Sequence, residues 1–307
     1  MEEKVMSKDY KEISLIKFQE KFQTEENCQK RLVELRWPDG FVCPRCEGRD
    51  YFDLPKRHLY QCKRCGYQAS MTAGTVMHGT RTPLLKWFWA IFLMSTDKRG
   101  ISALALSKKI EVSYWVAWTM LQKIRRGMRE RDSKYKLSGI IEIDDAFFGG
   151  PKEGGDRRGR GSSKTPVIIE ASTNGESIGY ARMTVVDKVD GNTVKEIVMA
   201  DVKEGQAIRS DGFNSYNVVK EAGYKHQKEL VKGRKAHEVL KWTHILISNA
   251  KAFIQGTFHG VDKKHLQAYL DEFCYRFNRR WSENLLFERL VTACVSSPSV
   301  MFSELTK

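Results

Sequence analysis

Four cysteines stand at a spacing that is typical of a zinc site. Two residues separate Cys43 from Cys46, two separate Cys62 from Cys65, and fifteen residues lie between the pairs. Each pair turns two thiolates toward one centre, and two pairs complete the tetrahedron that Zn²⁺ adopts in proteins. Because thiolates fill all four corners, no position is open for a reacting water. The spacing therefore predicts a structural zinc ion in a small ribbon.

A second set of residues has the chemistry of a catalytic metal site. Asp144 and Asp145 end a short β-like run at 139–143, and Asp211 directly follows another at 207–210. Carboxylates beside a polyanion would repel it unless a hard cation stood between them. Mg²⁺ or Mn²⁺ accepts one or two carboxylates together with phosphate oxygens. Two ions ~3.5–4 Å apart would activate the attacking oxygen and stabilise the leaving one.

The order of the elements around these aspartates decides whether they meet. The sequence predicts strands at 139–143, 167–172, 179–185 and 207–210, with a helix at 191–199 before the last strand and an Asn-Gly turn at 174–175. This is the RNase-H-like order, in which the first and fourth strands lie side by side. Asp144 and Asp211 are therefore expected at one edge of the sheet. Residues 151–164, dense in Gly, Arg, Lys and Ser, are expected to form a basic surface loop.

A helix-turn-helix is predicted between the ribbon and the first strand. Pro83 begins an apolar helix at 84–94, and helices at 101–110 and 114–128 follow, with Ser113 as the cap of the second. That second helix could enter a major groove, which makes Lys123, Arg125 and Arg126 candidate DNA-binding residues. A helix pair is also a common packing unit without DNA, so the pattern by itself leaves both roles open.

Charge and composition narrow the partner. The 307 residues include 52 Lys and Arg against 38 Asp and Glu, a net charge of +14, and 41% are hydrophobic. A chain of this length is expected to fold into two or three domains. Its charge favours a polyanion, such as nucleic acid or an acidic membrane, and argues against an acidic enzyme of small molecules. We find no secretory signal and no run approaching the ~20 apolar residues of a membrane helix, so a cytoplasmic protein without a membrane partner is expected.

Together these motifs resemble the zinc-ribbon insertion-sequence transposases of the ISXO-like kind. The resemblance covers residues 20–285 and rests on the ribbon, the helix pair after Gly100, and segments 142–150, 164–167, 210–216, 247–251, 256–259, 264–273 and 276–280. It implies an α/β (α+β) fold class with an RNase-H-like mixed-sheet catalytic domain. The expected domains are an N-terminal helical segment (1–38), the zinc ribbon (39–75), a helix-turn-helix-like DNA-binding region (80–135), the catalytic domain (138–285) and a C-terminal tail (286–307).

The resemblance also assigns catalytic residues. It puts the first catalytic aspartate on Asp144 and the second on Asp211, while Asp145 occupies a slot where many relatives have glutamate. The segment around Asn249 fits members that use asparagine as the third metal ligand. Lys251, together with Arg276, Arg279 and Arg280, is expected to hold DNA phosphates near the metal. The other candidates for the third ligand are His244, which stands near the glutamate slot of other members, and Glu238 and Glu272.

The function implied is that of a DNA transposase. Such an enzyme binds the terminal inverted repeats of its element in double-stranded DNA, cleaves strands with Mg²⁺ or Mn²⁺, and joins them to target DNA. Because two ends must be held together, a homo-oligomer is expected, associated with the nucleoid in the bacterial cytoplasm. Two alternatives remain: a transcription factor, which leaves Asp144 and Asp211 unexplained, and a nuclease of the same fold that does not transpose.

Overall fold

The computed structural model describes residues 13–149, 164–229 and 239–306, and the chain divides into two units. Unit 1 comprises 1–131 with 282–307, and unit 2 comprises 132–281. The expected basic loop, apart from Lys164, and the candidate ligand Glu238 lie outside the described residues. In the described part of the chain, no helix is long and apolar enough to cross a membrane.

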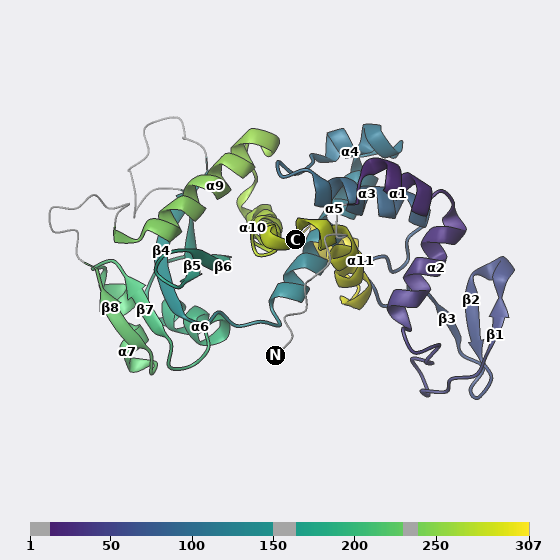
Figure 1. The fold of residues 1–307 in the computed structure, drawn as a ribbon, viewed down its shortest axis with the longest axis horizontal. Helices are drawn as coiled ribbons and strands as arrows, with labels where there is room; N and C mark the ends of the chain where they lie inside the picture. The colour runs from purple at the N-terminus through teal and green to yellow at the C-terminus, as the bar shows by residue number, and fades with distance from the viewer. Residues whose placement is uncertain (1–12, 150–163, 230–238, 307) are drawn as a thin grey trace, which may run out of the picture. The chain divides into compact units, whose positions relative to one another are not determined.

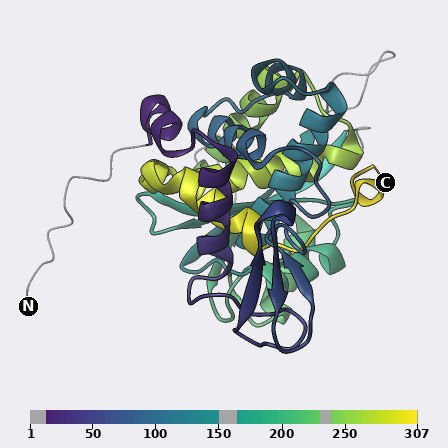
Figure 2. The ribbon, with the colours of Figure 1, turned by 90° about the vertical axis from the view of Figure 1, so that its right-hand side faces the viewer.

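The ribbon in unit 1 is a three-stranded antiparallel sheet, drawn in dark blue in Figure 2. Its strands are β1 (Tyr51–Leu54), β2 (Leu59–Cys62) and β3 (Gln68–Ser70), and the short helix η1 (Pro55–Arg57) joins the first two. Its small core contains Phe41, Ala69 and two of the cysteines, with Trp37 and Tyr60 packed against them. So few buried apolar groups give such a sheet little stability of its own, which explains the need for a metal.

Helices make up the rest of unit 1. They are α1 (Leu15–Lys21), α2 (Glu25–Arg36), α3 (Leu84–Thr96), α4 (Ala103–Ile110) and α5 (Tyr114–Asp132), followed near the C-terminus by α11 (Leu286–Ser296) and α12 (Phe302–Leu305). The predicted helix pair is present as α4 and α5. Ser102 Oγ accepts from Ala105 N at the start of α4, and Ser113 Oγ accepts from Val116 N at the start of α5.

The C-terminal segment differs from the tail that the sequence suggested. After the short helix η3 (Arg280–Leu285), residues 286–296 form α11, which packs on α3 and α2. Phe287 and Leu290 of α11 are buried, and the Phe287 ring contacts Phe18 of α1 and Phe88 of α3. The apolar face of α11 therefore completes the core of unit 1 instead of trailing from the catalytic domain.

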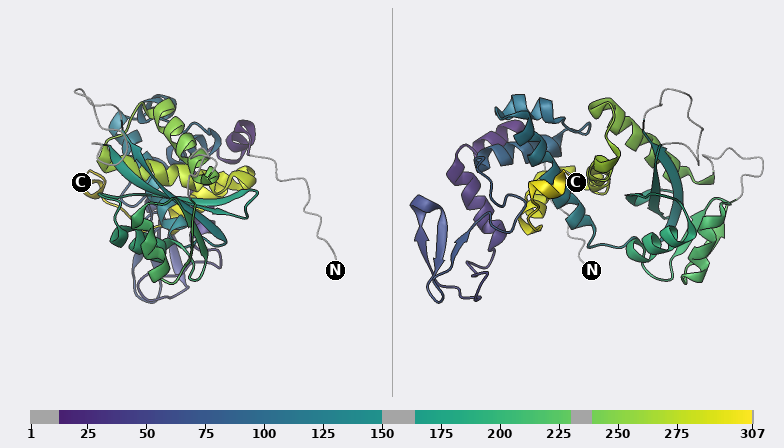
Figure 3. Two further views of the ribbon diagram at one scale, coloured as in Figure 1. Left: turned by 90° about the vertical axis from the view of Figure 1, so that its left-hand side faces the viewer. Right: turned by 180° about the vertical axis from the view of Figure 1, so that it is seen from behind.

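Unit 2 is built on a five-stranded mixed sheet in the order β6-β5-β4-β7-β8 (Figures 1 and 3). Its strands are β4 (Ile140–Phe148), β5 (Thr165–Thr173), β6 (Ile178–Val185), β7 (Ala207–Ser210) and β8 (Lys225–Lys228). β4, β5 and β6 pair antiparallel, whereas β7 lies parallel to both β4 and β8. The expected strand order and the pairing of the first strand with the fourth are confirmed; β8 was not predicted.

Helices cover both faces of this sheet (Figure 1). α9 (Lys241–Phe258) and α10 (Lys263–Phe277) share one core with Ala146 and Phe148 of β4. α6 (Gly191–Asp201), η2 (Asn214–Asn217) and α7 (Val218–Glu221) share the other core with Ile141 and Ile143. Because side chains alternate along a strand, β4 presents its even-numbered residues, Glu142 and Asp144 among them, to the α9 side.

Candidate functional site

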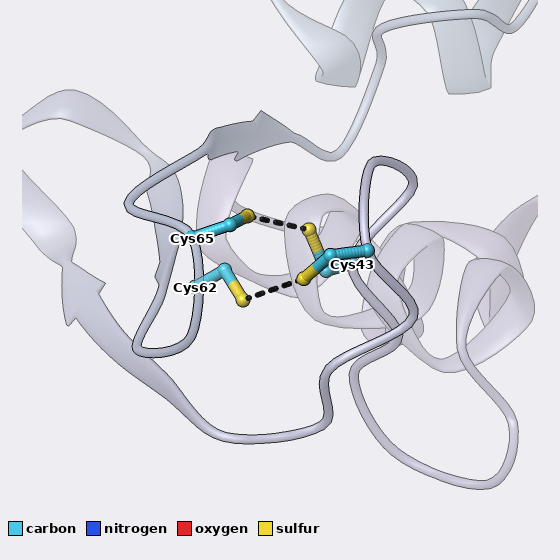
Figure 4. A group of neighbouring side chains, drawn as sticks. Cys43, Cys62 and Cys65 are labelled. Atoms are coloured by element: carbon cyan, nitrogen blue, oxygen red, sulfur yellow. Dashed lines mark hydrogen bonds between the residues drawn. The ribbon is translucent and has the colours of Figure 1, made fainter.

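The four predicted zinc ligands converge in the ribbon. Cys43 Sγ lies 3.7 Å from Cys65 Sγ, and Cys46 Sγ lies 3.6 Å from Cys62 Sγ (Figure 4). A tetrahedron of sulfur atoms with ~2.3 Å bonds to a central Zn²⁺ has edges of about 3.8 Å. In the described residues, these cysteines are the only group of three or more His, Cys, Asp or Glu ligands gathered within 4.8 Å of one another. The donor set and its spacing fit structural zinc.

Close packing around the thiols explains one residue of the ribbon. A Cβ added to Gly48 would lie 3.1 Å from Cys62 Sγ and 3.4 Å from Cys46 Sγ. A larger residue would press on the sulfur atoms, so the position requires glycine.

The two aspartates that the family resemblance marks as catalytic, Asp144 and Asp211, lie on neighbouring parallel strands. Ile143 pairs with Ser210 in the β4–β7 ladder, and Asp144 and Asp211 are the next residues of the two strands. Continuing this register brings both side chains to the same face of the sheet. Asp144 is only 8% exposed, whereas Asp211 is partly exposed at the strand end. Two carboxylates at such an edge form a donor set that hard divalent cations accept.

His244, in the first turn of α9, lies near Asp144. Its Nε2 atom is 3.7 Å from Asp144 Oδ2. That separation exceeds hydrogen-bond length, but both atoms could reach one cation, because ligand bonds are ~2.0–2.2 Å long. The sequence had left His244 among the alternatives.

Asn249, the expected third ligand, points elsewhere. It is exposed, and it follows His244 by five residues, which places it ~140° around a helix of 3.6 residues per turn. Lys251, seven residues after His244, returns to within ~20° of it. α9 therefore presents His244 and Lys251 on one flank and Asn249 on the other. Of the two candidates for the third ligand on α9, His244 is therefore the one on the flank near Asp144, and the assignment of Asn249 stays a prediction.

Glu272 is also committed to another contact. Glu272 is completely buried in α10, and its Oε1 lies 3.3 Å from Nη1 of Arg276. The two residues of this salt bridge are one helical turn apart. The contact gives Glu272, which the sequence offered as a candidate third ligand, a structural role within α10.

A buried tyrosine fixes the carboxylates from the opposite face. Tyr216 Oη donates a 3.0 Å hydrogen bond to Asp145 Oδ1, and Asp145 N donates a 2.8 Å bond to Asp144 Oδ1. Burial and then the charges of Asp145, Asp144 and Asp211 raise the pKa of Tyr216 well above its usual value, so the hydroxyl stays protonated as a donor. All three carboxylates are thus close enough to act on one buried phenol.

Lys251 extends the site along β4. Its Nζ lies 5.6 Å from the centre of the Phe148 ring, on the strand that carries Asp144. Burial first, and then the charge of Lys164, lower the pKa of Lys251. The two lysines form a cationic position near Phe148, on the strand that carries Asp144, and such a position suits an anionic oxygen.

Several predicted DNA contacts are instead structural. Arg125 is 1% exposed, so its guanidinium cannot reach DNA in this fold. Arg279 Nη2 donates to Asp132 Oδ1 at 2.6 Å, and its guanidinium lies 3.5 Å from the centre of the Tyr275 ring. Arg280 donates to the carbonyl oxygens of Ile178, Gly179 and Phe277. With Arg276 bound to Glu272, these residues hold α10 in place.

Two of the predicted contacts remain at the surface of unit 1. Arg126 is exposed and pairs at 2.9 Å with Glu130, one turn along α5. Lys123 is half-buried, with its Nζ 3.4 Å from His78 O, and burial lowers its pKa. Arg126 is therefore the better placed of the two for a phosphate.

The sequence did not predict roles for Glu142 or Tyr216. Both stand within motifs that carried the family resemblance, but only the fold reveals that Glu142 is buried beneath α9 and that Tyr216 reaches back to β4. The signal available in the sequence was an acidic residue inside an otherwise apolar strand, two positions before Asp144.

Known proteins resemble this chain over both units. The ISXO2-like transposase domain family matches residues 136–278, and the transposase zinc-ribbon domain family matches residues 23–68. An uncharacterized protein in the transposable element ISH50 of Halobacterium salinarum is 25% identical over 279 residues, covering 83% of this chain and 91% of that protein.

Solved structures give a weaker likeness. The pre-cleavage Mos1 transpososome is 14% identical, with a TM-score of 0.27 over 62% of this chain and 74% of that one. The Mos1 strand transfer complex is also 14% identical, with a TM-score of 0.23 over 73% and 81%. The fold assignment rests on the sheet order and the domain match, not on these scores.

Proposed function

The chain is an insertion-sequence transposase with a zinc ribbon and an ISXO2-like catalytic domain, and we propose that it binds its element's terminal inverted repeats and moves the element by cleavage and strand transfer. Both steps are in-line displacements at phosphorus. One site can perform both because only the nucleophile changes, from water to a DNA hydroxyl. The juxtaposition of Asp144 and Asp211 on parallel neighbouring strands carries this proposal.

The proposed metal ligands are Asp144, Asp211 and His244, with His244 in place of the expected Asn249. Two observations support His244 over Asn249: the 3.7 Å distance from His244 Nε2 to Asp144 Oδ2, and the rotation of α9. When bound, divalent ions supply an activated water and neutralise the charge that develops on the phosphate. An imidazole adds a nitrogen donor without negative charge, and such donors favour transition metals over Mg²⁺. We therefore place Mn²⁺ ahead of Mg²⁺ as the preferred ion.

The proposed DNA contacts are divided between the units. In unit 2, Lys251 binds a phosphate oxygen near the aspartates and so orients the scissile bond. In unit 1, the ribbon and the α4–α5 pair read the terminal repeat, with Arg126 on the backbone. We further propose that two or more copies assemble on paired ends, and that the protein works at the chromosomal DNA of the cell.

Removing a carboxylate tests the proposal. Asp144→Asn and Asp211→Asn should abolish cleavage of a terminal-repeat duplex and still bind it with affinity near that of the wild type, since the DNA-contacting cations are all retained. Cleavage at the wild-type rate in either variant would exclude that aspartate. Wild-type protein that binds the repeat and never cuts it in Mn²⁺ or Mg²⁺ would favour the transcription factor. Cleavage without joining to target DNA would favour the non-transposing nuclease.

A further inference from the structure

A buried carboxylate lies two residues before the first catalytic aspartate. Glu142 of β4 is 2% exposed, faces the same side of the sheet as Asp144, and is absent from the proposed metal ligands. Burying a carboxylate is costly unless charged or polar groups surround it, and here burial raises its pKa. Its partners therefore indicate what it is for.

Those partners are at the start of α9. Glu142 Oε2 accepts hydrogen bonds from Trp242 N at 2.9 Å and Thr243 N at 3.3 Å. The N-terminal N–H groups of a helix have no acceptor within the helix, and Leu240, at the cap position, provides no side-chain acceptor. A carboxylate there also interacts favourably with the helix dipole. The cap of α9 thus comes from the sheet and not from its own sequence.

An arginine steadies the carboxylate from the next strand. Arg209 Nη1 lies 3.7 Å from Glu142 Oε1, and Arg209 Nη2 donates to Glu229 Oε1 at 3.0 Å. Glu142 and Arg209 are register partners in the β4–β7 ladder, two positions before Asp144 and Asp211. The ladder therefore places Glu142 and Arg209 two residues before Asp144 and Asp211, on the same face of the sheet.

The spacing on α9 matches the spacing on β4. Glu142 binds the backbone at Trp242 and Thr243, and the next residue, His244, approaches Asp144, two residues along the strand. A shift of α9 along or around its axis would remove His244 from Asp144, and it would also move Lys251, which lies about two turns further along the helix over Phe148. The contact with Glu142 opposes both movements, because two adjacent N–H groups must point at one oxygen.

We propose that Glu142 is a positioning residue that caps α9 from β4 and so places His244 and Lys251 at the catalytic metal site. This role rests on the proposed function. It predicts that weakening the cap lowers metal affinity even while the protein stays folded. A carboxylate that served stability alone would lower the melting temperature and leave metal affinity unchanged.

The chain provides a matched control. Glu170 of β5 is 1% exposed, but it pairs with Ile143 and so faces the opposite side of the sheet, near Asp201 and Arg182. Glu142→Gln and Glu170→Gln thus replace similarly buried carboxyl groups on adjacent strands. Glu142→Asp keeps the charge and shortens the reach by one methylene, which provides a milder variant if Glu142→Gln does not fold.

The experiment titrates Mn²⁺ into the zinc-loaded full chain, with free Mn²⁺ followed by electron paramagnetic resonance. We expect Glu142→Gln to weaken Mn²⁺ binding about 10–100-fold, as is usual for groups that orient metal ligands, and Glu142→Asp to weaken it less. Glu170→Gln should stay within twofold of the wild type. Hydrogen exchange at residues 241–244 should accelerate in the Glu142 variants alone.

Each outcome has a clear meaning. Mn²⁺ affinity within twofold of the wild type in folded Glu142→Gln or Glu142→Asp overturns the proposal. Asp144→Ala, measured alongside, separates this failure from failure of the proposed function. If Asp144→Ala abolishes binding while the Glu142 variants do not weaken it, the metal site stands and the positioning role is refuted. If Asp144→Ala binds Mn²⁺ normally, the metal site is wrong and the role of Glu142 falls with it.

Discussion

Tyr216 Oη, fully buried five residues after Asp211, donates a 3.0 Å hydrogen bond to Asp145, the neighbour of Asp144. The bond ties the segment that follows β7 to the middle of β4. Phe213 N also donates to Asp211 Oδ1 at 3.0 Å, so the start of that segment holds Asp211 directly. The segment that follows β7 thus holds both Asp211 and Asp145, two carboxylates that are distant in sequence.

Tyr216→Phe should therefore destabilise unit 2 and loosen the site. Loss of a buried hydrogen bond to a charged acceptor costs about 1.5–3 kcal/mol, which chemical denaturation can measure. We also expect weaker Mn²⁺ binding, because Asp145 N positions Asp144. Tyr224→Phe is the control, since that buried hydroxyl donates only to carbonyl oxygens of Val198 and Val202 at 3.3 Å. Equal effects of both changes on Mn²⁺ affinity would argue against a specific role for Tyr216.

The identity of the third ligand has a spectroscopic test. If His244 binds the metal, electron spin echo envelope modulation of the Mn²⁺-loaded protein should show coupling to a directly bound nitrogen. His244→Ala should remove that coupling and most of the cleavage activity. His244→Glu should lose the coupling and improve cleavage in Mg²⁺ relative to Mn²⁺, because a carboxylate suits the harder ion.

Asn249→Ala is the matched comparison on the same helix. An exposed residue on the other flank of α9 should leave both the nitrogen coupling and the cleavage rate close to wild type when it is truncated. Severe loss of cleavage in Asn249→Ala, with His244→Ala still active, would restore the asparagine assignment.

Replacing one zinc-binding cysteine should impair the function of unit 1 separately from that of unit 2. Cys62→Ser should lose zinc and unfold the ribbon, because metal binding supplies much of the folding free energy of such a domain. Zinc content, by mass spectrometry, should fall from one ion per chain to none, and terminal-repeat binding should weaken. Cys28→Ala, at a buried cysteine of α2 outside the cluster, should retain the zinc. One equivalent of zinc in Cys62→Ser would contradict the four-thiolate site.

Substituting the neighbouring residues Arg125 and Arg126 of α5 should have opposite effects on protein stability and on the salt dependence of DNA binding. Arg126→Gln should make the salt dependence of DNA binding shallower, by ~0.9 in the log–log slope for each phosphate that Arg126 neutralises in the wild type. It should change stability by less than ~0.5 kcal/mol, since its ion pair with Glu130 is at the surface. Arg125→Gln should destabilise unit 1 and leave the slope unchanged, because the side chain is buried. An unchanged slope in Arg126→Gln would place α5 away from the DNA backbone.

Local pattern alone was enough to predict several features. The spacing of the cysteines predicted their convergence, because each pair can form only a tight turn. The order of strands and helix around Asp144 and Asp211 predicted their adjacency, because that order places the first strand beside the fourth, and the parallel β4–β7 ladder bears this out. These inferences needed only chain connectivity and backbone geometry.

Only the tertiary structure decided which side chains face the site. Two features set the rotation of α9: its cap from Glu142, and the packing of its buried face against β4 and β5. The buried residues of α9 are Thr243, Leu246, Ala250 and Ile254. That rotation brings His244 to Asp144 and turns Asn249 away. Likewise, the sequence suggests DNA binding for three arginines, Arg125, Arg279 and Arg280. It does so because the sequence shows that a residue is charged but not whether its side chain is buried. A side chain's role depends on the elements that pack over it, and these come from distant parts of the chain.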